Sequence, residues 1–176
     1  MKRIALAIAG TFLLSACGHD TRTPVALGTL VVPNQAPWLI LAPGPEEVEL
    51  RGLDSKLKFL PDPPLATALE AQLRAGVQQD YFPNLTIACD NIKAGMKVNA
   101  DDAPDTVVLE LSLRCTINAS GYVSTHQYAV APTTKVAAGS AEADYAKALG
   151  MLLRDGAGQV AVKLDADVRT SRPGAR

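Results

Sequence analysis

His126 is the histidine that could serve in catalysis, because the other one, His19, lies among polar residues near the N-terminus. A general base needs a positioned imidazole beside a nucleophile and an acid. The sequence contains no GxSxG, HExxH or glycine-rich phosphate motif. A packed or surface histidine is therefore the favoured interpretation, and an enzyme built around His126 is the alternative. We expect no catalytic residue and no cofactor.

Asp101, Asp102 and Asp105 form an acidic stretch that could offer oxygen ligands to calcium. Their spacing lacks the alternation of a calcium-binding loop, so a solvated turn is the favoured interpretation. The cysteines of the chain also lack the second pair of nearby ligands that a zinc site requires. We therefore expect no metal site.

The first sixteen residues have the features of a secretory signal. Lys2 and Arg3 give a positive start, and an apolar segment of 11 residues, 4–14, follows them. As a helix this segment would span about 16 Å, which is too short for a hydrocarbon core of roughly 30 Å. The small residues Ser15 and Ala16 complete the pattern of an exported protein.

The segment Leu14-Ser15-Ala16-Cys17 resembles the lipobox of bacterial lipoproteins. The resemblance implies cleavage before Cys17, a diacylglycerol on its sulfur and acylation of the new amino group. Acyl chains contribute about 0.8 kcal/mol per buried CH₂ and anchor a protein firmly. Gly18 follows the cysteine, which by similarity to sorted lipoproteins favours the periplasmic face of the outer membrane. An ordinary signal peptide with a chance cysteine is the alternative.

Cys89 and Cys115 are the cysteines beyond the lipobox, and both fall at the inward positions of alternating segments. The periplasm oxidises thiols, so a structural disulfide is favoured if the two strands are neighbours. It would close a loop of 26 residues and stabilise the fold by about 3.5 kcal/mol in the chain-entropy model. Two reduced, buried cysteines that act as small hydrophobic residues are the alternative.

The charge and composition of the chain narrow its partners. The precursor has 17 basic and 18 acidic side chains, and loss of Lys2 and Arg3 with the signal leaves 15 basic ones. No run of four basic residues exists, which argues against nucleic acid and against electrostatic docking on anionic lipid. Apolar residues make up 48% and charged ones 20%, as in a globular domain.

The first half of the mature chain predicts a tether, a strand and a helix. Residues 17–46 are expected to be the lipidated N-terminus and tether, with an extended stretch at 25–32 and an early strand at 37–41. A strand at 48–53 opens the domain, which covers 47–169. A helix from about Pro63 to Asp80, capped by Asp62, then presents one apolar face. That face carries Leu65, Leu69, Leu73 and Val77.

The second half predicts strands and a final helix. Residues 85–90 and 107–118 alternate apolar and polar side chains, as strands with one buried face do. A loop at 98–105 joins them. A turn at 118–121 and a return strand at 122–131 complete a hairpin, and a four-residue turn would place His126 opposite Leu113.

The last helix is expected to start with Ser140 as its cap and to carry apolar residues at Tyr145, Leu149, Leu152 and further on. Its glycines predict a kink or an early end near Gly156. Residues 170–176 form a frayed tail. Helices segregated on one face of a mostly antiparallel sheet make an α+β fold, a two-layer sandwich.

The order of these elements resembles that of small outer-membrane lipoproteins. These are the YajG-type lipoproteins of unassigned activity and the lipopolysaccharide-assembly lipoprotein LptE. The segment LATALEAQLRAG at 65–76 and the terminal helix at 145–153 carry the likeness. It implies a similar fold, and no functional residue is carried over with it.

Together these features predict a non-enzymatic accessory of the cell envelope, which binds another envelope protein or a lipid. The expected partners are the membrane, through acyl chains on Cys17, and an unidentified envelope protein. No nucleic acid and no small-molecule substrate are expected. A periplasmic immunity protein or inhibitor of a toxin or lysozyme is the first alternative, and an enzyme is the second.

Overall fold

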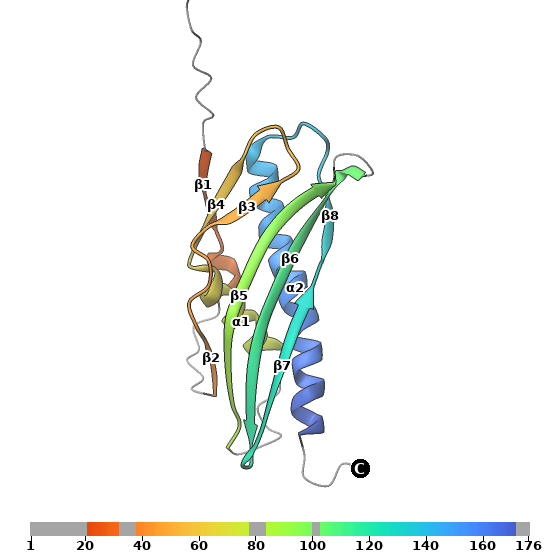
Figure 1. The fold of residues 1–176 in the computed structure, drawn as a ribbon. Helices are drawn as coiled ribbons and strands as arrows, with labels where there is room; N and C mark the ends of the chain where they lie inside the picture. Colours follow the sequence, from red (N-terminus) through yellow and green to blue (C-terminus); the bar gives the residue numbers. More distant parts are fainter. Residues whose placement is uncertain (1–20, 32–37, 78–83, 100–102, 172–176) are drawn as a thin grey trace, which may run out of the picture.

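The computed structural model describes residues 21–31, 38–77, 84–99 and 103–171 (Figure 1). Within these ranges eight strands form one sheet. The two helices lie on one face of the sheet, and the opposite face is open to solvent (Figure 1). Most strand pairs are antiparallel. The expected α+β fold class is therefore confirmed.

The sheet has the spatial order β1-β4-β3-β5-β6-β7, with β2 beside β5 and β8 beside β6. Parallel pairing occurs at β1–β4, β2–β5 and β3–β5. In chain order the elements are β1 (Thr21–Ala26), the 3-10 helix η1 (Gly28–Leu30), β2 (Leu39–Leu41), β3 (Val48–Arg51), β4 (Leu57–Asp62), α1 (Leu65–Gly76), β5 (Thr86–Asn99), β6 (Ala103–Ala119), β7 (Tyr122–Val130), β8 (Thr133–Lys135) and α2 (Glu142–Thr170).

Strand β6 separates the two faces of the sheet most clearly. From Val107 to Ala119 every second side chain is buried, and the residues between them face the open side. The buried set packs against a stripe of α2 that includes Leu149, Leu152 and Val160. Each such side chain stabilises the fold by about 1.5–3 kcal/mol when fully buried. The alternation at 107–118 thus predicted the strand and its inner face correctly.

Part of the segment expected to be a tether belongs to the sheet. Strand β1 pairs with β4, and β2 pairs with β5. Leu27, Leu30 and Trp38 are buried in the common core. Residues 21–31 and 38–41, expected to lie in the tether, therefore pack on the domain, and the early strand expected at 37–41 corresponds to β2. These apolar side chains cover core surface that the later elements leave exposed, which outweighs the breaks made by the neighbouring prolines.

The first helix is shorter than expected, and Asp62 does not cap it. Asp62 is the last residue of β4, and Pro64 occupies the N-cap position without a side-chain hydrogen bond. Strand β4 was missed because Pro61 interrupts its pattern, but its pairing with both β1 and β3 holds it in the sheet. The expected apolar face is buried, at Leu65, Leu69, Leu73 and Val77.

The β6–β7 hairpin has a two-residue turn instead of the expected four. Ser120 and Gly121 have φ angles of 52° and 82°, the left-handed backbone that a tight hairpin turn requires. Ala119 consequently pairs with Tyr122. This shifts the register by two residues, so His126 lies opposite Cys115 and not opposite Leu113.

Helix α2 runs without a break from Glu142 to Thr170, so the kink or early end expected near Gly156 was wrong. Gly156 lies where the helix meets the sheet, because a Cβ there would be 3.3 Å from the Leu111 side chain. Ala141 occupies the N-cap position, so Ser140 is not the cap. Thr170 belongs to the helix and Ser171 is its C-cap, while residues 172–176 of the expected tail lie outside the described residues.

Candidate functional site on the open face of the sheet

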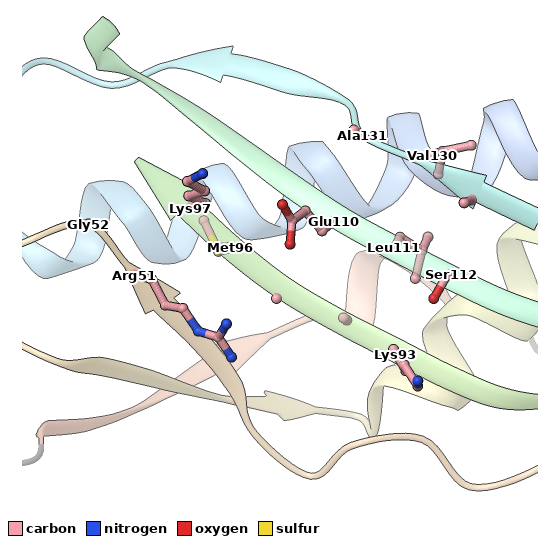
Figure 2. Close-up of a pocket in the computed structure, with 13 residues that line it drawn as sticks. Arg51, Gly52, Lys93, Met96, Lys97, Glu110, Leu111, Ser112, Val130 and Ala131 are labelled. Carbon is pink, nitrogen blue, oxygen red and sulfur yellow. The ribbon is translucent and has the colours of Figure 1, made fainter. Parts of the chain in front are cut away.

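The open face of the sheet carries a hollow of about 740 Å³ (Figure 2). This is within the range of ligand pockets, roughly 300–1,000 Å³. It spans the second half of β5, the middle of β6 and the end of β7, and the end of β3 forms part of its rim. The helices lie behind the sheet in this view, so the hollow faces away from the core (Figure 2).

Small residues make the floor of the hollow. Gly95 on β5, Ser112 on β6 and Ala129 and Ala131 at β7 all line it. Ser112 lies directly opposite Ala129 in the β6–β7 pair. A Cβ built on Gly95 would meet no atom within 4 Å, so the space above this glycine is empty. A strip of missing or short side chains therefore lowers the surface across three strands.

The second half of β5 positions the longer side chains of the hollow. The β5–β6 register shifts between Asp90 and Lys93. Beyond this shift Lys93 and Lys97 are exposed on the open face, while Met96 and Val98 are buried. Sequence reasoning missed these lysines because it ended the strand at residue 90 and began a loop at residue 98. The alternation of Met96 and Val98 with the lysines was the signal that could have found them.

Two cationic residues are cross-strand neighbours at the rim of the hollow. Arg51 on β3 is the direct cross-strand partner of Lys97 on β5. Like charges in this position destabilise a sheet. Arg51 Nε donates a hydrogen bond to Glu49 Oε2 at 3.0 Å. Lys97 makes no hydrogen bond or ion pair with any described residue, so this positive charge is not compensated within that part of the chain.

Glu110 and Lys93 complete the charged groups of the hollow. Glu110 lies opposite Gly95, between the positions of the two β5 lysines (Figure 2). Neither Glu110 nor Lys93 forms an ion pair within the described ranges. The hollow thus has three cations and one carboxylate, in a mature chain that we expect to be net negative.

Two other ion pairs of the sheet contrast with these unpaired groups. Arg114 donates two hydrogen bonds to Asp90, at 2.8 and 2.9 Å, and this guanidinium lowers the pKa of Asp90. Lys135 Nζ lies 2.8 Å from both carboxylate oxygens of Asp105 and lowers the pKa of that group. Of the acidic stretch considered for calcium, Asp105 is therefore held by a lysine.

Asp101 and Asp102 lie outside the described residues, as do Cys17 and His19. Within the described ranges, no group of three histidine, cysteine or acidic side chains has an arrangement that could hold a metal ion. No helix in those ranges is long and apolar enough to cross a membrane.

His126 belongs to a different cluster, on the helix-facing side of β7. Its Nε2 lies 3.1 Å from Ser124 Oγ, and its Nδ1 lies 3.4 Å from Asp167 Oδ2. Tyr128 Oη donates to the same carboxylate oxygen at 2.7 Å. Burial, and then this contact with Asp167, raise the pKa of Tyr128 well above its usual range. The cluster ties the last turns of α2 to β7, and it places a serine, a histidine and an aspartate in a row.

Cys89 and Cys115 lie directly opposite each other on β5 and β6, and a disulfide joins them. Both are buried among core side chains. They are therefore structural, and they fix β5 to β6 on the side of the register shift away from the hollow.

No family model matches the sequence, and no curated protein matches it. Solved structures resemble its fold. A Xanthomonas campestris protein described as belonging to family DUF330 is 15% identical with a TM-score of 0.50, over 86% of this chain and all of that one. A Caulobacter crescentus protein described as a "putative lipoprotein" is 14% identical with a TM-score of 0.48, over 78% of this chain and 93% of that one. At such identities the likeness to the Xanthomonas protein shows the fold alone.

Proposed function

We propose that this chain is a non-enzymatic binding protein of the bacterial envelope. Acyl chains on Cys17 hold it at the periplasmic face of the outer membrane, and the hollow on the open face binds an envelope protein or a lipid. The observation that carries the proposal is the hollow itself. It combines an empty floor at Gly95 with lysines that have no acidic partner among the described residues.

The open face of the sheet takes no part in the hydrophobic core, which supports a binding role for it. The helices cover the inner face, where the buried side chains of β6 pack. Nothing in the packing of the core requires lysines at positions 93 and 97, since both are exposed. Oppositely charged cross-strand pairs, such as Asp90 and Arg114, would stabilise the sheet more than these unpaired lysines do. Exposed, unpaired groups beside a hollow are available to a ligand.

Site-specific photo-cross-linking in intact cells tests this proposal. A photoreactive residue replaces Ser112 in the hollow of the full chain, and a matched variant carries it at Gln159, which is exposed on α2. We expect a cross-linked envelope protein or lipid from position 112 alone. Equal products from both positions, or none from position 112, would contradict binding at the hollow. The Cys17→Ser variant should lose both acyl labelling and the product.

The row of Ser124, His126 and Asp167 favours a second candidate, a hydrolase with Ser124 as the nucleophile. Such an enzyme also needs donors for the developing oxyanion. A fluorophosphonate probe should then label the wild type and leave Ser124→Ala unlabelled. If the wild type is not labelled, and His126→Ala complements a deletion fully, this candidate is excluded.

A further inference from the structure

We propose that Arg51 and Lys97 bind the oxyanion head of an anionic amphiphile, whose apolar body lies along the small-residue strip of the hollow. This inference rests on the proposed binding function and names the ligand class of that same site. The head is a phosphate group, and the body is an alkyl chain that reaches across Gly95 toward Ala129.

The charge arrangement at the rim supports an oxyanion there. Arg51 and Lys97 are direct neighbours across β3 and β5, so their charges repel. Glu49 occupies the Nε donor of Arg51. A guanidinium has four further N–H donors, and an ammonium has three. An oxyanion between the two side chains would accept from both and replace repulsion by two charge-assisted hydrogen bonds.

The extent of the hollow beyond the cation pair supports a ligand that has an apolar chain as well as a charged head. A free phosphate ion would need only the cation pair, whereas the hollow continues across β5 and β6 to the alanines at β7. Its floor there consists mainly of glycine and alanine. Glu110, opposite Gly95, disfavours a second negative charge in the middle. The ligand therefore carries its charge at one end.

The position of the charge distinguishes Lys97 from Lys93. Both are exposed lysines on the open face of β5, two residues to either side of Gly95. Lys97 lies opposite Arg51, and Lys93 lies opposite Ser112 on β6. Lys93 is thus a matched control, with the same charge and side chain but no second cation as its cross-strand partner.

Binding of an alkyl phosphate series to the full chain in a neutral, sugar-headed detergent tests the inference. The series runs from inorganic phosphate through methyl and butyl to hexyl phosphate at constant ionic strength, with hexanol as the uncharged arm. We expect inorganic phosphate to bind weakest. Affinity should rise about fourfold for each methylene that enters the hollow. Hexanol should not bind measurably.

Two substitutions, each with a matched comparison, distinguish binding of the phosphate head from binding of the alkyl chain. Lys97→Gln should weaken binding of every phosphate about tenfold, whereas Lys93→Gln, which removes a cation farther along the hollow, should weaken it clearly less. Gly95→Trp should leave inorganic phosphate unaffected and remove the dependence on chain length. A Cβ at Gly95 meets no atom within 4 Å, so this variant is expected to fold. Ala88→Trp, on the exposed face of the same strand, is its matched control.

Three results would overturn the inference. Inorganic phosphate that binds as tightly as hexyl phosphate would make the ligand a free ion. Equal losses in Lys97→Gln and Lys93→Gln would remove the assigned head site. No binding of any alkyl phosphate, with a protein cross-linked at position 112 in cells, would leave the binding function standing and disprove the amphiphile. Thermal unfolding of each variant controls for misfolding.

Discussion

Polar groups on the helix-facing side of the sheet and in the hollow on its open side differ in how far they are paired. On the helix-facing side, His126 and Tyr128 both contact Asp167, and the cysteines form a disulfide. In the hollow on the open side, Lys97 has a cation as its neighbour and no acidic partner among the described residues. Satisfied polar groups hold the fold together, whereas an exposed, uncompensated charge does not contribute in this way and is available to the ligand that we propose.

The largest expected effect is the loss of stability when a buried side chain of β6 is truncated, compared with an exposed one. Leu109 on β6 is fully buried, and its neighbour Val108 points to the open side. Leu109→Ala should lower the free energy of unfolding by about 2–5 kcal/mol, because it leaves a cavity in the core. Val108→Ala should change it by about 0.5 kcal/mol or less. Denaturant unfolding measures both, and similar losses would contradict the assignment of the faces.

The disulfide should have the next largest effect. Replacing both Cys89 and Cys115 by serine should lower the free energy of unfolding by about 2–4 kcal/mol, since the unfolded chain then loses its cross-link. The comparison is with the oxidised wild type under the same denaturant. Alkyl phosphate binding should survive in the folded variant, because the bridge lies outside the hollow. Loss of binding would mean that the disulfide also affects the shape of the hollow.

Removing the hydrogen bond between Tyr128 and Asp167 should lower the stability moderately, and this loss should depend on pH. Tyr128→Phe removes a hydrogen bond to a carboxylate and should cost about 1–2 kcal/mol near neutral pH. The folded state raises the pKa of Tyr128 above the ordinary value of 10.0. The folded protein therefore retains a proton that the unfolded chain releases, and stability should fall as the pH rises above about 10. In Tyr128→Phe this part of the pH dependence should be absent.

The smallest expected effect is a gain in stability and not a loss. Lys97→Gln should stabilise the ligand-free protein by a few tenths of a kcal/mol, because it relieves the repulsion by Arg51. Lys93→Gln, without a cation as its partner, should leave stability unchanged. Thermal unfolding at low ionic strength measures the difference, and added salt should reduce it. A destabilised Lys97→Gln variant would mean that the lysine has a structural role.

The inner face of the fold could be predicted from the sequence, and the hollow could not. Alternation in β6 and the spacing of Leu65, Leu69 and Leu73 reflect burial, which is a strong and regular signal. The β5 lysines and Gly95 follow a register shift, so the alternation of the first part of the strand does not continue in phase and their segment was assigned to no element. The turn at Ser120 and Gly121 shows the same limit, since one choice of turn length moved His126 from Leu113 to Cys115.

The pairing of β1 sets how far the proposed anchor can be from the hollow. Only four peptide links separate Cys17 from Thr21, and they reach at most about 14 Å when extended. Thr21 pairs with Leu57, which pairs with Leu50, next to Arg51. A lipid on Cys17 would therefore hold the Arg51 end of the sheet toward the bilayer. The cationic mouth of the hollow would open at the height of the lipid head groups, where an amphiphile could pass between membrane and protein without crossing open water.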